Sequence, residues 1–192
     1  RLQEYLIVEF PVEFRNTQSF PPYFQYNITT TFSGSEKFRW GLRAYTTSTG
    51  ARSVYADYSG KVRIDQTISC IGIALHSELI LKKFNRSELA MVLEVGHILS
   101  YLKVEGYFKL GNYPEETFSE KFKSANRMFE TGLCYRYLLN DRLFLFTQAS
   151  IQGNITGELQ STDGDSTLDD FSADWSGLKA FIGMGLRFKK TN

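Results

Sequence analysis

Residues 70–81 of this chain read Cys-Ile-Gly-Ile-Ala-Leu-His-Ser-Glu-Leu-Ile-Leu, and the alternation within them decides the fold. One face collects large apolar residues, which are Ile71, Ile73, Leu75, Leu79 and Leu81. The other face collects small and ionisable residues, which are Cys70, Gly72, Ala74, His76 and Glu78. Because successive side chains of a β-strand point to opposite faces, this segment predicts a strand with one apolar and one polar face.

The same alternation recurs along all 192 residues, and helical periodicity is nearly absent. Eight runs carry it, near residues 5–14, 24–32, 38–45, 70–81, 89–101, 128–137, 143–152 and 178–188. No linker separates these runs, so we expect a single all-β domain over residues 1–192.

The connections between the runs alternate between short and long. Short turns are expected near residues 33–36, 82–87 and 140–142, and long polar loops near residues 46–66, 111–123 and 161–174. Bacterial outer-membrane barrels have short periplasmic turns on one rim and longer extracellular loops on the other. The sequence therefore predicts an eight-stranded antiparallel up-and-down transmembrane β-barrel with that arrangement of turns and loops.

Composition excludes several classes of protein. The net charge of +1 offers no electrostatic basis for binding nucleic acid. No window approaches the roughly 18 uncharged apolar residues that a membrane helix requires. The chain begins at Arg1 without a Met or an apolar leader, as a secreted protein does after signal-peptide removal and as a truncated chain also does.

Glycine and charge indicate which face of the barrel is inside. In a soluble calycin-type barrel the apolar face lines a ligand cavity, whereas in a membrane barrel it contacts lipid. A basic side chain facing lipid at the bilayer midplane costs about 2–4 kcal/mol, and glycine on a solvated strand face weakens the strand. We therefore expect the polar faces to form an interior charge network of Glu9, Glu13, Arg39, Arg43, Glu78, Glu94, Glu130, Arg136, Lys179 and Arg187.

Aromatic residues make up 15% of the chain and fall near the ends of the runs. Those towards the expected long-loop rim are Phe14, Phe20, Phe24, Tyr45, Tyr101, Tyr107 and Trp175. Those towards the other rim are Phe32, Phe38, Trp40, Phe84, Tyr135, Tyr137 and Phe188. Two such girdles are expected where a barrel crosses the membrane–water interfaces.

The last run, Phe181-Ile182-Gly183-Met184-Gly185-Leu186-Arg187-Phe188, resembles the C-terminal assembly signal of Gram-negative outer-membrane barrels. Gly183, Leu186 and Phe188 carry that resemblance, although residues 189–192 extend past the final aromatic. The whole chain is similar in architecture to the small eight-stranded family of the OmpA membrane domain, OmpX and OmpW. The resemblance implies an integral protein of a Gram-negative outer membrane, inserted by the outer-membrane assembly machinery.

The sequence predicts no enzyme, cofactor or metal site. His76 lies on the expected interior face beside Glu78, as a hydrogen-bonded interior histidine would. His97 lies on the apolar face, and Leu99 replaces the serine that lipid A deacylases of this size place two residues after such a histidine. Cys70 and Cys134 are expected to be free buried thiols. The acidic segment 163–174 is expected to be a solvated loop rather than a calcium site.

We expect a non-enzymatic barrel whose packed, charge-paired interior leaves its loops or outer wall to act in envelope integrity, in adhesion or as an accessory subunit. Expected partners are outer-membrane lipid, lipopolysaccharide and other envelope proteins. One alternative is a narrow pore or transporter for small hydrophobic molecules, suggested by the inward direction of Phe144 and Phe146. A soluble ligand-binding calycin is the other.

Overall fold

The computed structural model describes residues 23–58, 60–111, 114–162 and 167–188. Among these residues all regular structure is β-strand, and no helix is long and apolar enough to cross a membrane. The strands are β1 (Gln25–Ser33), β2 (Phe38–Asp57), β3 (Gly60–Lys83), β4 (Ser87–Leu110), β5 (Glu116–Leu138), β6 (Leu143–Ile155), β7 (Glu158–Ser161), β8 (Thr167–Ser172) and β9 (Gly177–Leu186). The first predicted run, residues 5–14, lies outside the described residues, and so do Glu9 and Glu13.

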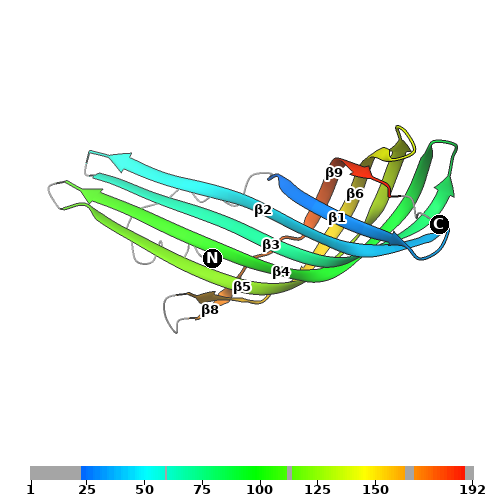
Figure 1. The fold of residues 1–192 in the computed structure, drawn as a ribbon. Helices are drawn as coiled ribbons and strands as arrows, with labels where there is room; N and C mark the ends of the chain where they lie inside the picture. Colours follow the sequence, from blue (N-terminus) through cyan, green and yellow to red (C-terminus); the bar gives the residue numbers. More distant parts are fainter. Residues whose placement is uncertain (1–22, 59, 112–113, 163–166, 189–192) are drawn as a thin grey trace.

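The strands form one antiparallel up-and-down sheet that curls into a half-barrel (Figure 1). The hydrogen-bonded order is β1-β2-β3-β4-β5-β6-β9, while β7 pairs with β5 and β8 pairs with β7. Seven of the eight predicted runs correspond to strands on this path. Because direction alternates along the seven, β1 and β9 run the same way at the two ends of the path.

Four central strands are much longer than predicted. β2 has 20 residues, β3 and β4 have 24 each, and β5 has 23. At about 3.3 Å per residue, β3 and β4 span roughly 80 Å. Together the four project past β1, β6 and β9 as a sheet that we call the blade (Figure 1). We define the blade as the strand residues within 46–69 and 102–122.

The predicted long loops at residues 46–66 and 111–123 are therefore wrong. Residues 46–57 continue β2, residues 60–66 begin β3, and residues 116–123 begin β5. Only two residues separate β2 from β3, and five separate β4 from β5. The third predicted loop, residues 161–174, contains the last residue of β7 and all of β8. The rim opposite the short turns is therefore extended by long strands, β2 to β5, and not by long loops.

An inversion of polarity explains why these strand segments read as loops. We call the end of the sheet at the short turns its lower end and the blade its upper end. In the lower part of β3, even-numbered residues point inward and are polar, as at His76 and Glu78. In the upper part, even-numbered residues still point inward, but Ile64 and Ile68 are apolar and buried. The outward face changes in the opposite sense, from the exposed apolar Ile71 to the polar positions before it. The alternation continues without a break while its two faces exchange character.

Glycines on the inner face accommodate aromatic rings from the neighbouring strand. Gly72 is paired with Tyr45, and a Cβ built on Gly72 would lie 2.1 Å from Cζ of that ring. Gly183 lies in the same way under the ring of Phe146. Any larger residue at these positions would push the aromatic ring away, which accounts for glycine in strands that it otherwise weakens.

Candidate functional site

The outer wall of the lower half-barrel is an apolar belt. We define the belt as the outward-facing side chains within the ranges 38–44, 71–81, 89–101, 129–137, 143–155 and 178–186. Its large apolar side chains are exposed; for example, Val95 is 67% exposed and Ile182 is 89% exposed. Contiguous apolar patches of this extent on a protein surface indicate contact with lipid or with another protein.

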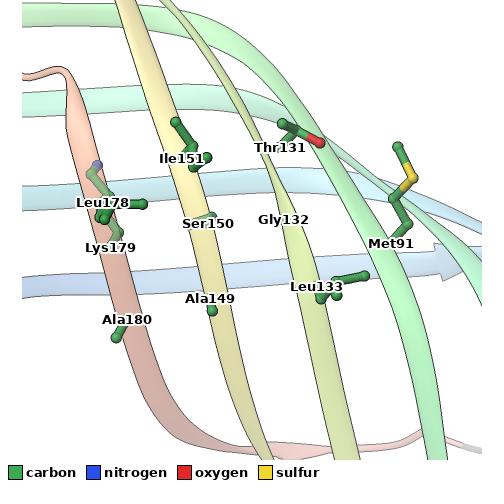
Figure 2. A pocket seen from close by; sticks show the side chains of 10 residues that line it. All are labelled: Met91, Thr131, Gly132, Leu133, Ala149, Ser150, Ile151, Leu178, Lys179 and Ala180. Atoms are coloured by element: carbon green, nitrogen blue, oxygen red, sulfur yellow. The ribbon is translucent and has the colours of Figure 1, made fainter.

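The belt contains an apolar hollow of about 590 Å³ across β4, β5, β6 and β9 (Figure 2). Three of its lining residues are small, namely Gly132, Ala149 and Ala180. Met91 and Leu178 stand at opposite sides of it.

Aromatic residues are exposed at both edges of the belt. At the short-turn edge, Phe32, Trp40 and Tyr137 are exposed, and at the blade edge Phe24 and Tyr101 are exposed. Tyr45 and Trp175, predicted for the girdle at the blade edge, are instead 5% and 4% exposed inside the sheet. That prediction is wrong because their positions near strand ends did not reveal the direction of their side chains.

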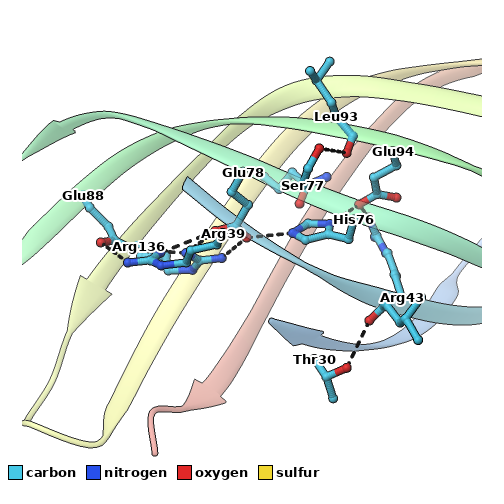
Figure 3. A network of polar contacts seen from close by, with 12 residues as sticks. Thr30, Arg39, Arg43, His76, Ser77, Glu78, Glu88, Leu93, Glu94 and Arg136 are labelled. Atoms are coloured by element: carbon cyan, nitrogen blue, oxygen red, sulfur yellow. Dashed lines mark hydrogen bonds and ion pairs between the residues drawn. The ribbon is translucent and has the colours of Figure 1, made fainter. Parts of the chain in front are cut away.

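The concave inner face of the lower half-barrel holds a continuous network of charged side chains (Figure 3). Four cations and four anions belong to it, which are Arg39, Arg43, Arg136 and Lys179 with Glu78, Glu88, Glu94 and Glu130. The formal charges of these eight groups cancel. Buried charges are tolerated when they are paired and hydrogen-bonded. Each of the eight groups has a partner of opposite charge, while the buried Arg43 Nε, Glu94 Oε2 and Arg136 Nε have no hydrogen-bond partner among the described residues.

Next to the short turns, two arginines and two glutamates form a closed ring. Arg136 contacts both Glu78 and Glu88, with Nη1 lying 2.6 Å from Oε2 of Glu78 and 3.0 Å from Oε1 of Glu88. Arg39 contacts the same two carboxylates, with Nη2 lying 2.7 Å from Oε2 of Glu88. The Arg136 guanidinium also lies 5.3 Å from the centre of the Phe144 ring. Each charge in the ring therefore has two partners of opposite sign.

His76 connects this ring to the middle of the network. Its Nε2 lies 2.7 Å from Oε1 of Glu78, and its Nδ1 lies 2.6 Å from Oε1 of Glu94. Ionised carboxylates only accept hydrogen bonds, and a neutral imidazole has one N–H to donate. The two contacts therefore require a proton on each ring nitrogen or a proton on one of the carboxyl groups. In both cases His76, Glu78 and Glu94 together hold one proton more than a neutral imidazole and two ionised carboxylates would hold.

The network continues towards β9. Nη1 of Arg43 donates to Oε1 of Glu94 at 2.7 Å and lies 3.6 Å from Oε1 of Glu130. Ser150 donates to the same Glu130 oxygen at 2.6 Å. Nζ of Lys179 lies 3.7 Å from Oε2 of Glu130. The same Nζ donates to Oε1 of Gln25 at 2.9 Å, so this side chain reaches across the concave face from β9 to β1.

The sequence placed most of these residues on the inner face. Of the ten predicted network members, Arg39, Arg43, Glu78, Glu94, Glu130, Arg136 and Lys179 lie in the network described above. Glu9 and Glu13 lie outside the described residues. The prediction for Arg187 is wrong, because this residue follows the end of β9 and its side chain is exposed rather than buried in the lumen.

Glu88 belongs to the network although the sequence did not predict it there. It has the same parity as Glu94 on β4 and so could have been found by extending the alternation to the first residues of that strand. Of the assembly-signal residues, Gly183 lies on the inner face under Phe146. Leu186 and Phe188 are exposed, at 63% and 89%.

Above the charged network the inner face becomes mainly apolar. The buried cluster there includes Val62, Ile64, Ile68, Leu102, Val104 and Phe122. The segment after β8 closes over it, because Trp175 is buried in the cluster and donates through Nε1 to Ser100 Oγ at 2.9 Å. Asn126 fixes the same segment by donating to the Ala173 carbonyl at 3.0 Å. The lumen is thus occupied by paired charges below and by apolar packing above.

The other residues singled out in the sequence, where the structure describes them, are not grouped into a metal site. Cys70 and Cys134 are free and buried, as expected. His97 is exposed on the belt, where its register partners are Ile73 and Arg127. Within the described ranges no three His, Cys, Asp or Glu side chains are grouped closely enough to hold a metal ion. Asp163 and Asp165 lie outside those ranges.

No protein family matches the sequence, and no curated protein matches it either.

Proposed function

We propose that this chain is a non-enzymatic, integral outer-membrane β-barrel protein that presents a rigid β-sheet blade outside the bilayer. The observation that carries the proposal is the inversion of polarity along β3, β4 and β5, whereas β2 keeps the polar Thr47 and Thr49 on its inner face. Below the inversion the strands are apolar outside and charged inside, as a barrel in lipid requires. Above it they are apolar inside and polar outside, as a β-structure in water requires.

The height of the belt supports a membrane position. From Leu81 to Ile71 on β3 the belt runs roughly 33 Å along the strand, and from Leu89 to Tyr101 on β4 roughly 40 Å. At a strand tilt of 45° these lengths correspond to heights of about 23 and 28 Å. Outer-membrane barrels have an apolar band about 25 Å tall.

A closed barrel requires one more strand. Because β1 and β9 run in the same direction, an antiparallel sheet closes only through a strand that runs opposite to both. The run of residues 5–14 is our candidate for this strand, with Glu9 and Glu13 facing the lumen. An eighth strand would also remove both sheet edges, which lipid does not tolerate.

The packed lumen favours a structural or adhesive role over transport. A transporter for small hydrophobic molecules would need a dry apolar path, whereas the network from Arg39 to Lys179 fills the lower lumen with ion pairs. Phe144 and Phe146 do point inward, but each ring lies against a glycine of β9 and not along an open channel. A soluble calycin would place its charges outside and its apolar residues inside along the whole strand length. We therefore assign the work of the protein to its outer wall and blade, in envelope integrity, adhesion or service as an accessory subunit.

Cysteine labelling tests the membrane position. In a Cys70→Ala/Cys134→Ala background, Leu93→Cys places a thiol on the belt and Lys61→Cys places one on the outer face of the blade. In proteoliposomes, a membrane-impermeant maleimide should label Lys61→Cys rapidly and Leu93→Cys at least about tenfold more slowly, because lipid covers the belt. In detergent-free buffer the protein should not remain soluble as a monomer. Equal labelling of the two thiols in folded protein would refute the membrane assignment.

A further inference from the structure

At the upper edge of the belt, basic residues gather on one side of the outer wall. Lys121, Lys123 and Arg127 occupy outward positions on β5, and Lys103 lies outward on the neighbouring β4. We call these four residues the basic strip. The corresponding outward positions of β2 and β3 are uncharged, at Thr46, Ser48, Thr67 and Ser69. The positive charge at this level is therefore concentrated on the β4–β5 wall.

Among the described residues, the basic strip has few acidic partners. Lys103 and Lys121 are directly opposite each other across the two strands, an arrangement in which like charges are destabilising. Lys103 pairs with Glu105 at 2.7 Å. Within the described part of the chain, Lys121, Lys123 and Arg127 have no ion-pair partner within 4.0 Å. An external anion would relieve this repulsion.

Apolar and aromatic side chains flank these cations. Lys123 is opposite Tyr101 on β4, and Arg127 lies between His97 of β4 and Ile155 of β6. A groove of about 390 Å³ adjoins the strip, with Leu99, Tyr101, Ala125 and Lys123 among its lining residues. Glu158 and Gln160 of β7 complete its far side, so one carboxylate faces the groove as well.

We propose that the basic strip and this groove form a docking surface for the phosphorylated headgroup of lipopolysaccharide. The proposal rests on the proposed function, because it needs the belt in lipid and the blade outside. The lysines and Arg127 would contact lipid A phosphates, which arginine can bind through two parallel hydrogen bonds. Leu99 and Ala125 would contact the first methylenes of its acyl chains. A ligand with both parts must be an anionic amphiphile positioned at the outer membrane–water interface.

Matched triple variants test the surface. Lys121→Gln/Lys123→Gln/Arg127→Gln removes three charges from the strip. Lys61→Gln/Lys82→Gln/Lys83→Gln removes three charges from the blade tip and the opposite rim. Each folded protein, checked by its heat-dependent gel mobility, is titrated in micelles with diphosphorylated lipid A and with fully dephosphorylated lipid A.

At about 1 kcal/mol for each basic residue near an anionic surface, the strip variant should bind diphosphorylated lipid A on the order of 100-fold more weakly than the unchanged protein. The control variant should stay within about threefold. Dephosphorylated lipid A should bind the unchanged protein as weakly as the strip variant binds the phosphorylated form. Glu158→Gln should bind severalfold more tightly, because it removes the carboxylate that faces the groove.

Three results would overturn the docking surface. One is unchanged binding by the folded strip variant, another is an equal loss in the control variant, and the third is equal affinity for both forms of lipid A. Failure of the unchanged protein to enter micelles or bilayers would instead overturn the proposed function. Insertion without a preference for phosphorylated lipid A would overturn the docking surface alone.

Discussion

Buried charges in the lumen depend on one another, and Glu94 shows this most directly. It accepts from Arg43 at 2.7 Å and contacts His76 at 2.6 Å, and its side chain is buried. Removing one partner of a buried pair leaves an uncompensated charge, whereas replacing both partners by apolar groups is often neutral. The lumen should therefore tolerate paired replacements better than single ones.

Glu94→Leu should lower the free energy of unfolding by about 3–5 kcal/mol, because it leaves the charge of Arg43 without this partner. The double change Arg43→Met/Glu94→Leu should recover part of that loss. Urea unfolding in micelles measures both. The control is Asp65→Asn on the blade, where the partners Arg52 and Arg63 are at least 40% exposed and the loss should be at most about 1 kcal/mol. A loss of similar size in Glu94→Leu and Asp65→Asn would show that the lumen is solvated.

At the scale of strands, the sequence predicted direction and pairing better than length. Every lower strand segment among the described residues was found, because a charged inner face and an apolar outer face give a clear period of two. The blade was missed, because Val62, Ile64 and Ile68 are apolar on the face that is polar at His76. Periodicity measured against one fixed face cannot follow a strand whose inner face changes from polar to apolar along its length.

Membership of the inner-face network could also be predicted from the alternation of side chains. Residue parity places a side chain inside or outside the sheet, so the sequence alone is enough to group Arg43, Glu94 and Glu130 on one face. Parity does not give the register between strands, and the individual partners therefore do not follow from it. The position of Trp175 does not follow from it either, since an irregular segment after β8 has no periodicity.

Closure of the sheet by residues 5–14 is testable with proline. Val8→Pro should lower the urea midpoint of unfolding and weaken resistance of the folded form to dodecyl sulfate, because proline removes a ladder hydrogen bond from a strand paired on both sides. Ser19→Pro, in the stretch before the existing Pro21-Pro22 pair, is the matched control and should leave both measurements unchanged. Equal behaviour of the two variants would exclude residues 5–14 as the closing strand.

In the molecule as a whole, two different sets of side chains fill the lumen, one above the other. The lower one is the ion-paired network, and the upper one is the apolar cluster that Trp175 joins. Eight-stranded barrels have an interior just wide enough to be filled by side chains. The protein should therefore show no steady conductance in planar bilayers.

The Trp175→Ala variant should also show no steady conductance in planar bilayers, because the charged network below Trp175 is unaffected. A stable ion-sized channel in the unchanged protein would contradict the packed interior. Conductance that appears only in Trp175→Ala would show that the upper cluster is the sole barrier.

The uninterrupted passage of β2, β3, β4 and β5 from belt to blade has a mechanical consequence. The register between β3 and β4 continues from Gly60–Leu110 at the tip to Lys83–Glu88 near the short turn, with a single shift near Ile80. A pull applied at the tip is thus carried along continuous backbone ladders into the half-barrel. Because the blade and the wall of the half-barrel are one sheet, a force on the tip acts directly on that wall.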